Sequence, residues 1–179
     1  MAKRVAFSII LALALVPTGL VTPRTERLVA AQTTSNACGL LTIDEIQPLA
    51  PVNEKIGDGV GGASQPGGRM TCRYEWGTGT GRYILNVIVA DASVMFAGKS
   101  PDVIKQGLAA PAAMPAAGTV SEAIPGVGEA AAFKSDSPFL ATTSAFMKGR
   151  ILQLNLDGYA ARDKKDQVIA LLKTASARL

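Results

Sequence analysis

The sequence contains no histidine, few aromatic residues and only two cysteines. Without histidine, the chain has no serine–histidine or cysteine–histidine catalytic pair, no histidine ligand for zinc or haem, and no histidine pH switch. Two cysteines are too few for an all-cysteine zinc or iron–sulfur site within one chain. The 179 residues are 48% hydrophobic and 18% charged, which fits one folded domain, with or without a processed leader, and excludes a disordered chain.

The amino-terminal segment has the pattern of a secretory signal. Two basic residues precede an apolar core, residues 5–16, that is interrupted by one serine. A positive start followed by about 7–15 apolar residues is typical of a signal peptide, whereas a membrane span needs about 20. Small residues before Gln32 predict cleavage there, with a signal at 1–31 and a mature domain at 32–179. Because the stretch before this site is long and polar, an earlier cut or an uncleaved anchor stays open.

The net charge of +4 comes mostly from the leader. Residues 1–31 hold four basic residues and one acidic residue, so residues 32–179 have a net charge of +1. A nearly neutral mature chain lacks the basic surface that a nucleic-acid partner requires. We therefore expect an exported domain, periplasmic or extracellular, with no nucleic-acid partner and no stable membrane span after signal cleavage.

The two cysteines, Cys38 and Cys72, are expected to form a disulfide, because an exported chain meets oxidising conditions and the count is even. Closing this loop stabilises the fold by about 3–4 kcal/mol on the chain-entropy model. The spacing is not that of a Cys-x-x-Cys redox or metal pair. Cys38 also lies far behind the apolar core and lacks the residues that precede a lipidated cysteine, so lipidation is not expected.

Hydrophobic periodicity predicts an α+β fold: a mainly antiparallel sheet of five to six strands packed with three helices, in a single domain. Alternation of apolar and polar residues predicts strands at 70–76, 120–124, 131–135, 139–147 and 150–156. The segment 82–92 is apolar on both faces, which predicts a central strand covered on both sides. Helices are expected after the caps Thr42 and Ser100 and over 163–179.

Two glycine-rich stretches do not fit nucleotide-binding motifs. Residues 57–68 lack the Lys-Ser or Lys-Thr ending and the following helix of a phosphate-binding loop, so a flexible loop is expected there. Residues 126–131 match Gly-x-Gly-x-x-Ala, but no long amphipathic helix or later acidic residue accompanies them. They are expected to form a tight turn before a strand. No cofactor is predicted.

Carboxylates near the last helix are the best catalytic candidates left. Asp157, Asp163 and Asp166 cluster there, but lysines stand between the last two, which suit the start of a helix. The serines lack the Gly-x-Ser-x-Gly pattern of a nucleophile elbow, and no segment has the alternating oxygen ligands of a calcium loop. We therefore predict no catalytic residue, no metal ligand and no enzymatic activity.

Trp76, Arg73 and Arg82 are the candidate ligand-binding residues. Trp76 ends a strand beside a glycine-rich loop and faces the same side as Cys72 and Tyr74, so its ring is expected to be at least partly buried. A partly exposed ring would offer a ligand an apolar platform, with Arg73 and Arg82 pairing an anionic group. The competing interpretation, which we favour, is that Trp76 belongs to the core.

Three short motifs carry a resemblance to a known class of proteins. They are Cys38-Gly39-Leu40-Leu41-Thr42, Cys72-Arg73-Tyr74-Glu75-Trp76 and Gly126-Val127-Gly128-Glu129-Ala130. Together they resemble a widespread class of exported bacterial domains of unknown function, many of them lipoproteins, over most of residues 37–179. The resemblance implies an envelope domain with a PsbP-like fold and a Cys38–Cys72 bridge. It supplies no catalytic residues, and this chain departs from it in the cysteine at position 38, which does not look lipidated.

These observations predict an exported, non-enzymatic binding or interaction domain whose partner is an envelope protein or a small ligand. A structural component of the cell envelope is the alternative. A hydrolase that works without histidine is the less favoured third class.

Overall fold

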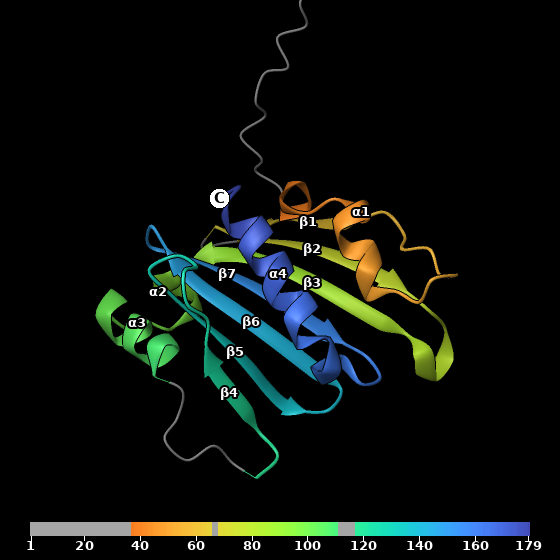
Figure 1. Cartoon of the computed structure of the whole chain (residues 1–179). Coiled ribbons are helices and arrows are strands. Elements are labelled where there is room, and N and C mark those ends of the chain that lie inside the picture. The colour runs from red at the N-terminus through yellow and green to blue at the C-terminus, as the bar shows by residue number, and fades with distance from the viewer. Residues whose placement is uncertain (1–36, 66–67, 111–116) are drawn as a thin grey trace, which may run out of the picture. The chain divides into compact units, whose positions relative to one another are not determined.

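Figure 1 shows the computed structural model of the chain, which describes residues 37–65, 68–110 and 117–179. These residues belong to one unit of the chain, residues 31–179. The predicted signal peptide, residues 1–31, lies outside the described residues, so the signal and its cleavage site stay predictions.

The domain is built on one antiparallel sheet. In the described part of the chain its seven strands are β1 (Val60–Gln65), β2 (Arg69–Trp76), β3 (Tyr83–Asp91), β4 (Val120–Ala123), β5 (Ala130–Ser137), β6 (Leu140–Met147) and β7 (Arg150–Asp157). Their order is β1-β2-β3-β7-β6-β5-β4, and each neighbouring pair is antiparallel. The predicted α+β class is confirmed, and the sheet is larger than the five to six strands expected.

Four α-helices accompany the sheet among the described residues. They are α1 (Ile43–Ile46), α2 (Ala92–Met95), α3 (Pro101–Ala109) and α4 (Lys165–Ser176). Short 3₁₀ turns are η1 (Ala37–Leu40), η2 (Gln47–Leu49), η3 (Gly79–Gly81) and η4 (Ala161–Lys164). The three predicted helices correspond to α1, α3 and α4. The helix that the prediction lacks, α2, is a single turn directly after β3 and is too short to leave a periodic pattern.

The strand that the prediction lacks is β1, which lies in the segment expected to be a flexible loop. Its pairing with β2 places Val60 opposite Arg73. Just before it, a Cβ atom on Gly59 would lie 2.6 Å from Cε1 of Tyr74 and 2.7 Å from Sγ of Cys72, so only glycine lets the backbone pass this close. The loop prediction is therefore wrong for this stretch, because glycines carry no side-chain alternation from which a strand can be read.

One face of the sheet holds the main core. Figure 1 shows α4 and the amino-terminal helices lying over this face. The buried residues contributed by the central strands and by α4 are Met70, Cys72, Tyr74, Trp76, Leu85, Val87, Val89, Leu152, Leu154, Leu156, Val168, Leu171, Leu172 and Ala175. Each buried Leu or Val side chain contributes about 1.5–3 kcal/mol, so this face dominates the stability of the domain.

Among the described residues, helices cover the second face of the sheet at one end only. There α2 and α3 pack on a small cluster formed by Ala92, Ile104, Phe146 and Ile151. The position of β3 between β2 and β7 confirms the central strand predicted over 82–92. The expected cover on both sides is present at the Ala90 end, where this residue is buried, whereas Ile84 and Asn86 remain partly exposed.

Predicted caps and turns agree with the structure. At the start of α3, Oγ of Ser100 accepts a hydrogen bond of 3.4 Å from the Val103 N–H, and Pro101 occupies the first helical position. Between β6 and β7, Lys148 and Gly149 have φ values of 49° and 75°. Two positive φ angles are what a two-residue hairpin loop of this hand requires.

The amino-terminal segment, residues 37–56, is fastened to the sheet covalently. Cys38 and Cys72 form a disulfide, which confirms the predicted bridge. The Tyr74 hydroxyl shares its one proton between the carbonyl oxygens of Cys38 and Leu41, at 3.2 and 3.0 Å, as a bifurcated hydrogen bond. Both contacts join the segment to β2, through Cys72 and Tyr74, which lie two residues apart on the same face of that strand.

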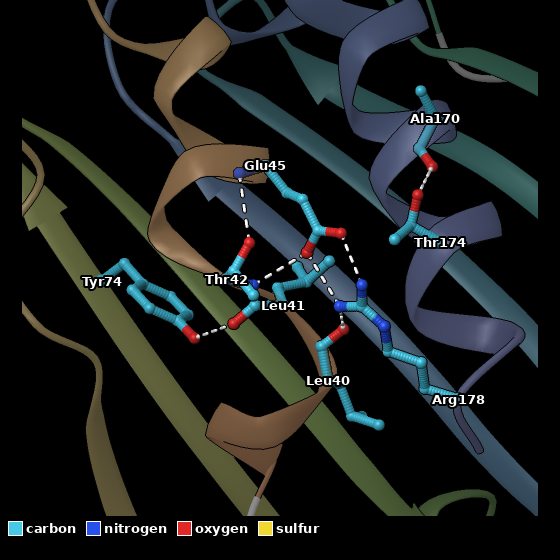
Figure 2. A network of polar contacts seen from close by, with 8 residues as sticks. All are labelled: Leu40, Leu41, Thr42, Glu45, Tyr74, Ala170, Thr174 and Arg178. Atoms are coloured by element: carbon cyan, nitrogen blue, oxygen red, sulfur yellow. Dashed lines mark hydrogen bonds and ion pairs between the residues drawn. The ribbon is translucent and has the colours of Figure 1, made fainter.

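A second attachment, which we call the Glu45 clasp, joins the segment to the end of the chain through Thr42, Glu45 and Arg178 (Figure 2). The Thr42 N–H donates to Oε2 of Glu45 at 2.8 Å, and the Glu45 N–H donates to Oγ1 of Thr42 at 3.4 Å. This confirms the predicted capping box at the start of α1. The Arg178 guanidinium binds both oxygens of the carboxylate, at 2.5 and 2.8 Å, and the Leu40 carbonyl at 2.9 Å.

The clasp lowers the pKa of the Glu45 carboxyl from 4.5 to about 2. The hydrogen bond from Arg178 is the largest cause, followed by the backbone N–H of Thr42, and both favour the ionised form. The carboxylate is thus held in its charged state over the whole neutral and mildly acidic range.

We expect Glu45→Gln to destabilise the domain by about 1–2 kcal/mol near neutral pH, after allowance for solvent screening of this partly exposed pair. Because the folded-state pKa lies below its ordinary value, the stabilisation is present above about pH 4.5 and is lost as the pH falls toward about 2. Denaturant unfolding of both proteins across this pH range measures the effect.

Asp44→Asn is the matched control. It removes the same charge from the same turn, but the Asp44 side chain is exposed. A stability difference between the wild type and Glu45→Gln that stays constant down to about pH 2 would contradict the assignment of the clasp.

Candidate functional site

The structure separates the three residues that the sequence nominated for binding. Trp76 is 3% exposed and lies in the main core. Arg73 and Arg82 both bind the carboxylate of Glu75, which strand alternation places on the opposite face of β2. The Trp76 ring therefore has no open face for a ligand beside these arginines, and the core interpretation of Trp76 is confirmed by its burial. Ligand binding by Arg73 and Arg82 stays a prediction.

The two arginines share one counter-charge. Hydrogen bonds from Arg82 and then from Arg73 lower the pKa of the Glu75 carboxyl. The cluster is solvent-exposed, with Arg82 half exposed. An anionic ligand at this cluster would have to compete with a carboxylate that is already in place.

A cavity beside Arg82 lies at one end of the sheet, where β3 begins and β7 ends; we call it the end cleft. It has a volume of about 850 Å³ and is lined by Pro51, Glu54, Thr80, Gly81, Arg82, Tyr83, Ile84, Phe139, Asp157, Gly158 and Tyr159. Since α2 follows the last residue of β3, this end lies away from α2 and α3 (Figure 1). Four separate segments of the chain thus meet around one cavity.

Three aromatic residues form the apolar wall of the end cleft. Phe139 and Tyr159 are 53% and 66% exposed, and their ring centroids lie 6.3 Å apart. Tyr83 lies deeper, because its ring stacks on Trp76 with the two planes 8° apart. Exposed aromatic rings gathered in a cavity are typical of ligand-binding surfaces.

Backbone contacts fix the position of Tyr83. Its hydroxyl donates a 2.5 Å hydrogen bond to the Tyr159 carbonyl. A Cβ atom on Gly158 would lie 2.2 Å from Cδ1 of Tyr83, and the φ of this glycine is 154°, so the tyrosine ring packs directly on the glycine backbone. Burial, and then the negative charge of Glu54, raise the pKa of the Tyr83 hydroxyl, which keeps it protonated as a donor.

The charged groups of the end cleft are mainly acidic. Glu54 and Asp157 line it, and the one cation in the lining, Arg82, is already bound to Glu75. Oε2 of Glu54 is buried and has no hydrogen-bond partner among the described residues, and the same holds for Nε1 of Trp76. A buried oxygen that accepts no hydrogen bond raises the free energy of the folded state. This wall of the cleft therefore lacks an N–H or O–H donor for Oε2 of Glu54.

Arg73 lines a different and smaller cavity on the open face of the sheet. This second cavity has a volume of about 470 Å³, and Arg69, Thr71, Asn86 and Asn155 are among its lining residues. Arg73 and Arg82 therefore border two separate cavities, although they meet at one carboxylate.

Among the described residues, no three His, Cys, Asp or Glu side chains are grouped so that they could hold a metal ion. No helix in the same part of the chain is long and apolar enough to cross a membrane. Asp163 and Asp166 lie in the first turns of η4 and α4, as predicted.

Sequence reasoning missed the aromatic wall and Glu54. Phe139 follows a proline and Tyr159 follows a glycine, and both lie just outside strands. An aromatic residue in a turn at a strand end was the sequence signal that could have indicated this wall. Tyr83 was read only as part of a strand, and Glu54 lies in a loop with no motif.

We expect Trp76→Ala to destabilise the domain by about 3–5 kcal/mol, because the indole is buried and truncation leaves a cavity in the core. Arg73→Ala is the control from the same strand, and its effect should stay within about 0.5 kcal/mol, as for other exposed side chains. Denaturant unfolding gives both values. A Trp76→Ala protein as stable as the wild type would show that the ring is not part of the core.

No family model matches this chain, and neither the curated proteins nor the solved structures include a significant match. The resemblance to exported bacterial domains and to a PsbP-like fold therefore stays a prediction. What this domain does has to be inferred from its own cavity, charges and disulfide.

Proposed function

We propose that this protein is an exported binding domain that holds a small ligand in the end cleft without chemical turnover. The observation that carries the proposal is the cleft itself. Its volume of about 850 Å³ lies in the range of small-molecule sites, roughly 300–1,000 Å³, and it combines aromatic walls with a few polar groups.

Export is part of the proposal and is supported by the disulfide. Bridges such as Cys38–Cys72 form and persist in oxidising compartments outside the cytosol. The signal-like pattern at the amino terminus points the same way. Both observations are consistent with a periplasmic or extracellular location.

Binding is favoured over turnover by the chemistry of the lining. The sequence has no histidine that could activate a hydroxyl nucleophile, and the described residues that line the cleft include no serine, cysteine or lysine. The lining does hold the Thr80 hydroxyl, but no histidine or lysine stands in the lining to act as its base. The polar groups of the lining are two carboxylates, two tyrosine hydroxyls, a threonine hydroxyl and an arginine, and they can orient a ligand by charge and hydrogen bonding.

Arg82 belongs to this proposed site, since it lines the cleft, whereas Arg73 does not. The sequence-based prediction for Arg82 is therefore retained in a changed form. Its guanidinium forms part of the rim, and Tyr83, Phe139 and Tyr159 replace Trp76 as the apolar surface.

The test is a screen of small aromatic and aliphatic fragments against the oxidised domain, followed by backbone amide NMR shifts. We expect the shifts caused by bound fragments to cluster in residues 80–84 and 157–159. Phe139→Ser and Tyr159→Ser should weaken binding at least about 10-fold with stability changed by no more than about 0.5 kcal/mol, since both rings are exposed.

Val94→Ser is the matched control, because Val94 is also an exposed apolar residue, 50% accessible, but lies in α2 at the other end of β3. Fragment shifts that cluster elsewhere, or binding that survives both aromatic substitutions, would contradict the proposed site. Conversion of a bound fragment to a product would contradict the non-enzymatic part.

A further inference from the structure

We infer that the end cleft selects a small molecule that joins an apolar or aromatic body to a positively charged nitrogen. This inference rests on the proposed function and adds the chemical class of the ligand. It is carried by the charge balance of the cleft, by its free aromatic surface and by an unsatisfied buried oxygen.

The charge balance of the lining is negative. Glu54 and Asp157 contribute two carboxylates, and no described residue forms an ion pair with either of them. Arg82 is the only cation among the described residues of the lining, and it shares the Glu75 carboxylate with Arg73. A cationic ligand would therefore find uncompensated negative charge, whereas an anionic ligand would meet repulsion.

The surroundings of Tyr83 do not reverse this balance. The Lys164 amine lies 5.6 Å from the centre of the Tyr83 ring, and no other described lysine lies over that ring. Asp163 adds a third carboxylate that acts on the Tyr83 hydroxyl together with Glu54. With the cluster of Arg73, Glu75 and Arg82 included, four carboxylates stand against three cations, so the described residues at this end of the sheet keep a net negative charge.

The free aromatic surface suits a cation as well as an apolar group. Tyr83 is occupied by Trp76 and Lys164, so the available ring faces belong to Phe139 and Tyr159. A cation over such a face gains about 0.5–1 kcal/mol at an exposed site and more when water is excluded. An ammonium group in the cleft would thus be attracted both by the ring faces of Phe139 and Tyr159 and by the neighbouring carboxylates.

The buried Oε2 of Glu54 supplies the third argument. It accepts no hydrogen bond from any residue that the structure describes, and the Gln47 side-chain amide donates to the Glu54 carbonyl at 2.7 Å. This hydrogen bond holds the backbone of the turn that carries the carboxylate. An ammonium group brings N–H donors, which are the groups that this wall of the cleft lacks.

The experiment uses three probes with the same phenylpropyl body and different heads: 3-phenylpropan-1-ammonium, 3-phenylpropan-1-ol and 3-phenylpropanoate. Binding to the oxidised domain is followed by amide shifts and by the fluorescence of Trp76, the single tryptophan, which stacks behind Tyr83. We expect the ammonium to bind at least about 5-fold more tightly than the alcohol and the carboxylate to bind most weakly.

Asp157→Asn tests the charge without disturbing the core, because Asp157 is exposed. It should weaken binding of the ammonium about 3- to 10-fold and leave binding of the alcohol unchanged. Asp102→Asn is the matched control, since it removes one exposed carboxylate from α3, at the other end of the sheet. Added salt should weaken binding of the ammonium probe to the wild type far more than its binding to Asp157→Asn.

The outcomes separate the two proposals. If the carboxylate or the alcohol binds as tightly as the ammonium, or if Asp157→Asn leaves ammonium binding unchanged, the ligand class is wrong while the cleft remains a binding site. If none of the three probes shifts the amides of the cleft, the proposed function fails and the ligand class fails with it.

Discussion

The attachment of the amino-terminal segment to the sheet is the constraint on which the rest of the domain depends. Residues 37–56 cover the part of the core face that β2 and β3 contribute, and three kinds of contact hold them there. These are the Cys38–Cys72 disulfide, the hydrogen bonds of Tyr74, and the Glu45 clasp. The disulfide is the strongest of them at about 3–4 kcal/mol, compared with about 1 kcal/mol for each hydrogen bond.

The end cleft follows from this attachment and from the uneven cover of the sheet. Glu54 reaches the cleft because the fastened segment continues past α1 and η2 to the end where β3 begins. On the other face, α2 and α3 cover only the end where β3 finishes. Strand ends at the uncovered side place Tyr83, Phe139 and Tyr159 around an open space. The fastened segment thus supplies one wall of the proposed site, with Glu54, and the strand ends supply the aromatic wall.

Most of the fold could be predicted because its signals are local. Alternation located the core strands, the Thr42 and Ser100 caps located two helices, and an even cysteine count in an export-like chain located the bridge. The strand β1 could not be predicted, since glycines leave no alternation to read. The site was harder still. The sequence indicated Trp76 at the end of β2, but its ring is buried in the core. The residues that line the cleft come from segments far apart in the sequence, and the strand order brings them together.

Amide hydrogen exchange of the oxidised and reduced domain tests the central claim most directly. If the disulfide holds the amino-terminal segment in place, reduction should speed exchange in residues 40–54 by about 10²–10³-fold, while β5, β6 and β7 keep their protection. The wall of the end cleft that carries Glu54 should loosen with the segment. Unchanged protection of residues 40–54 after complete reduction, or an equal loss across the whole sheet, would contradict the account.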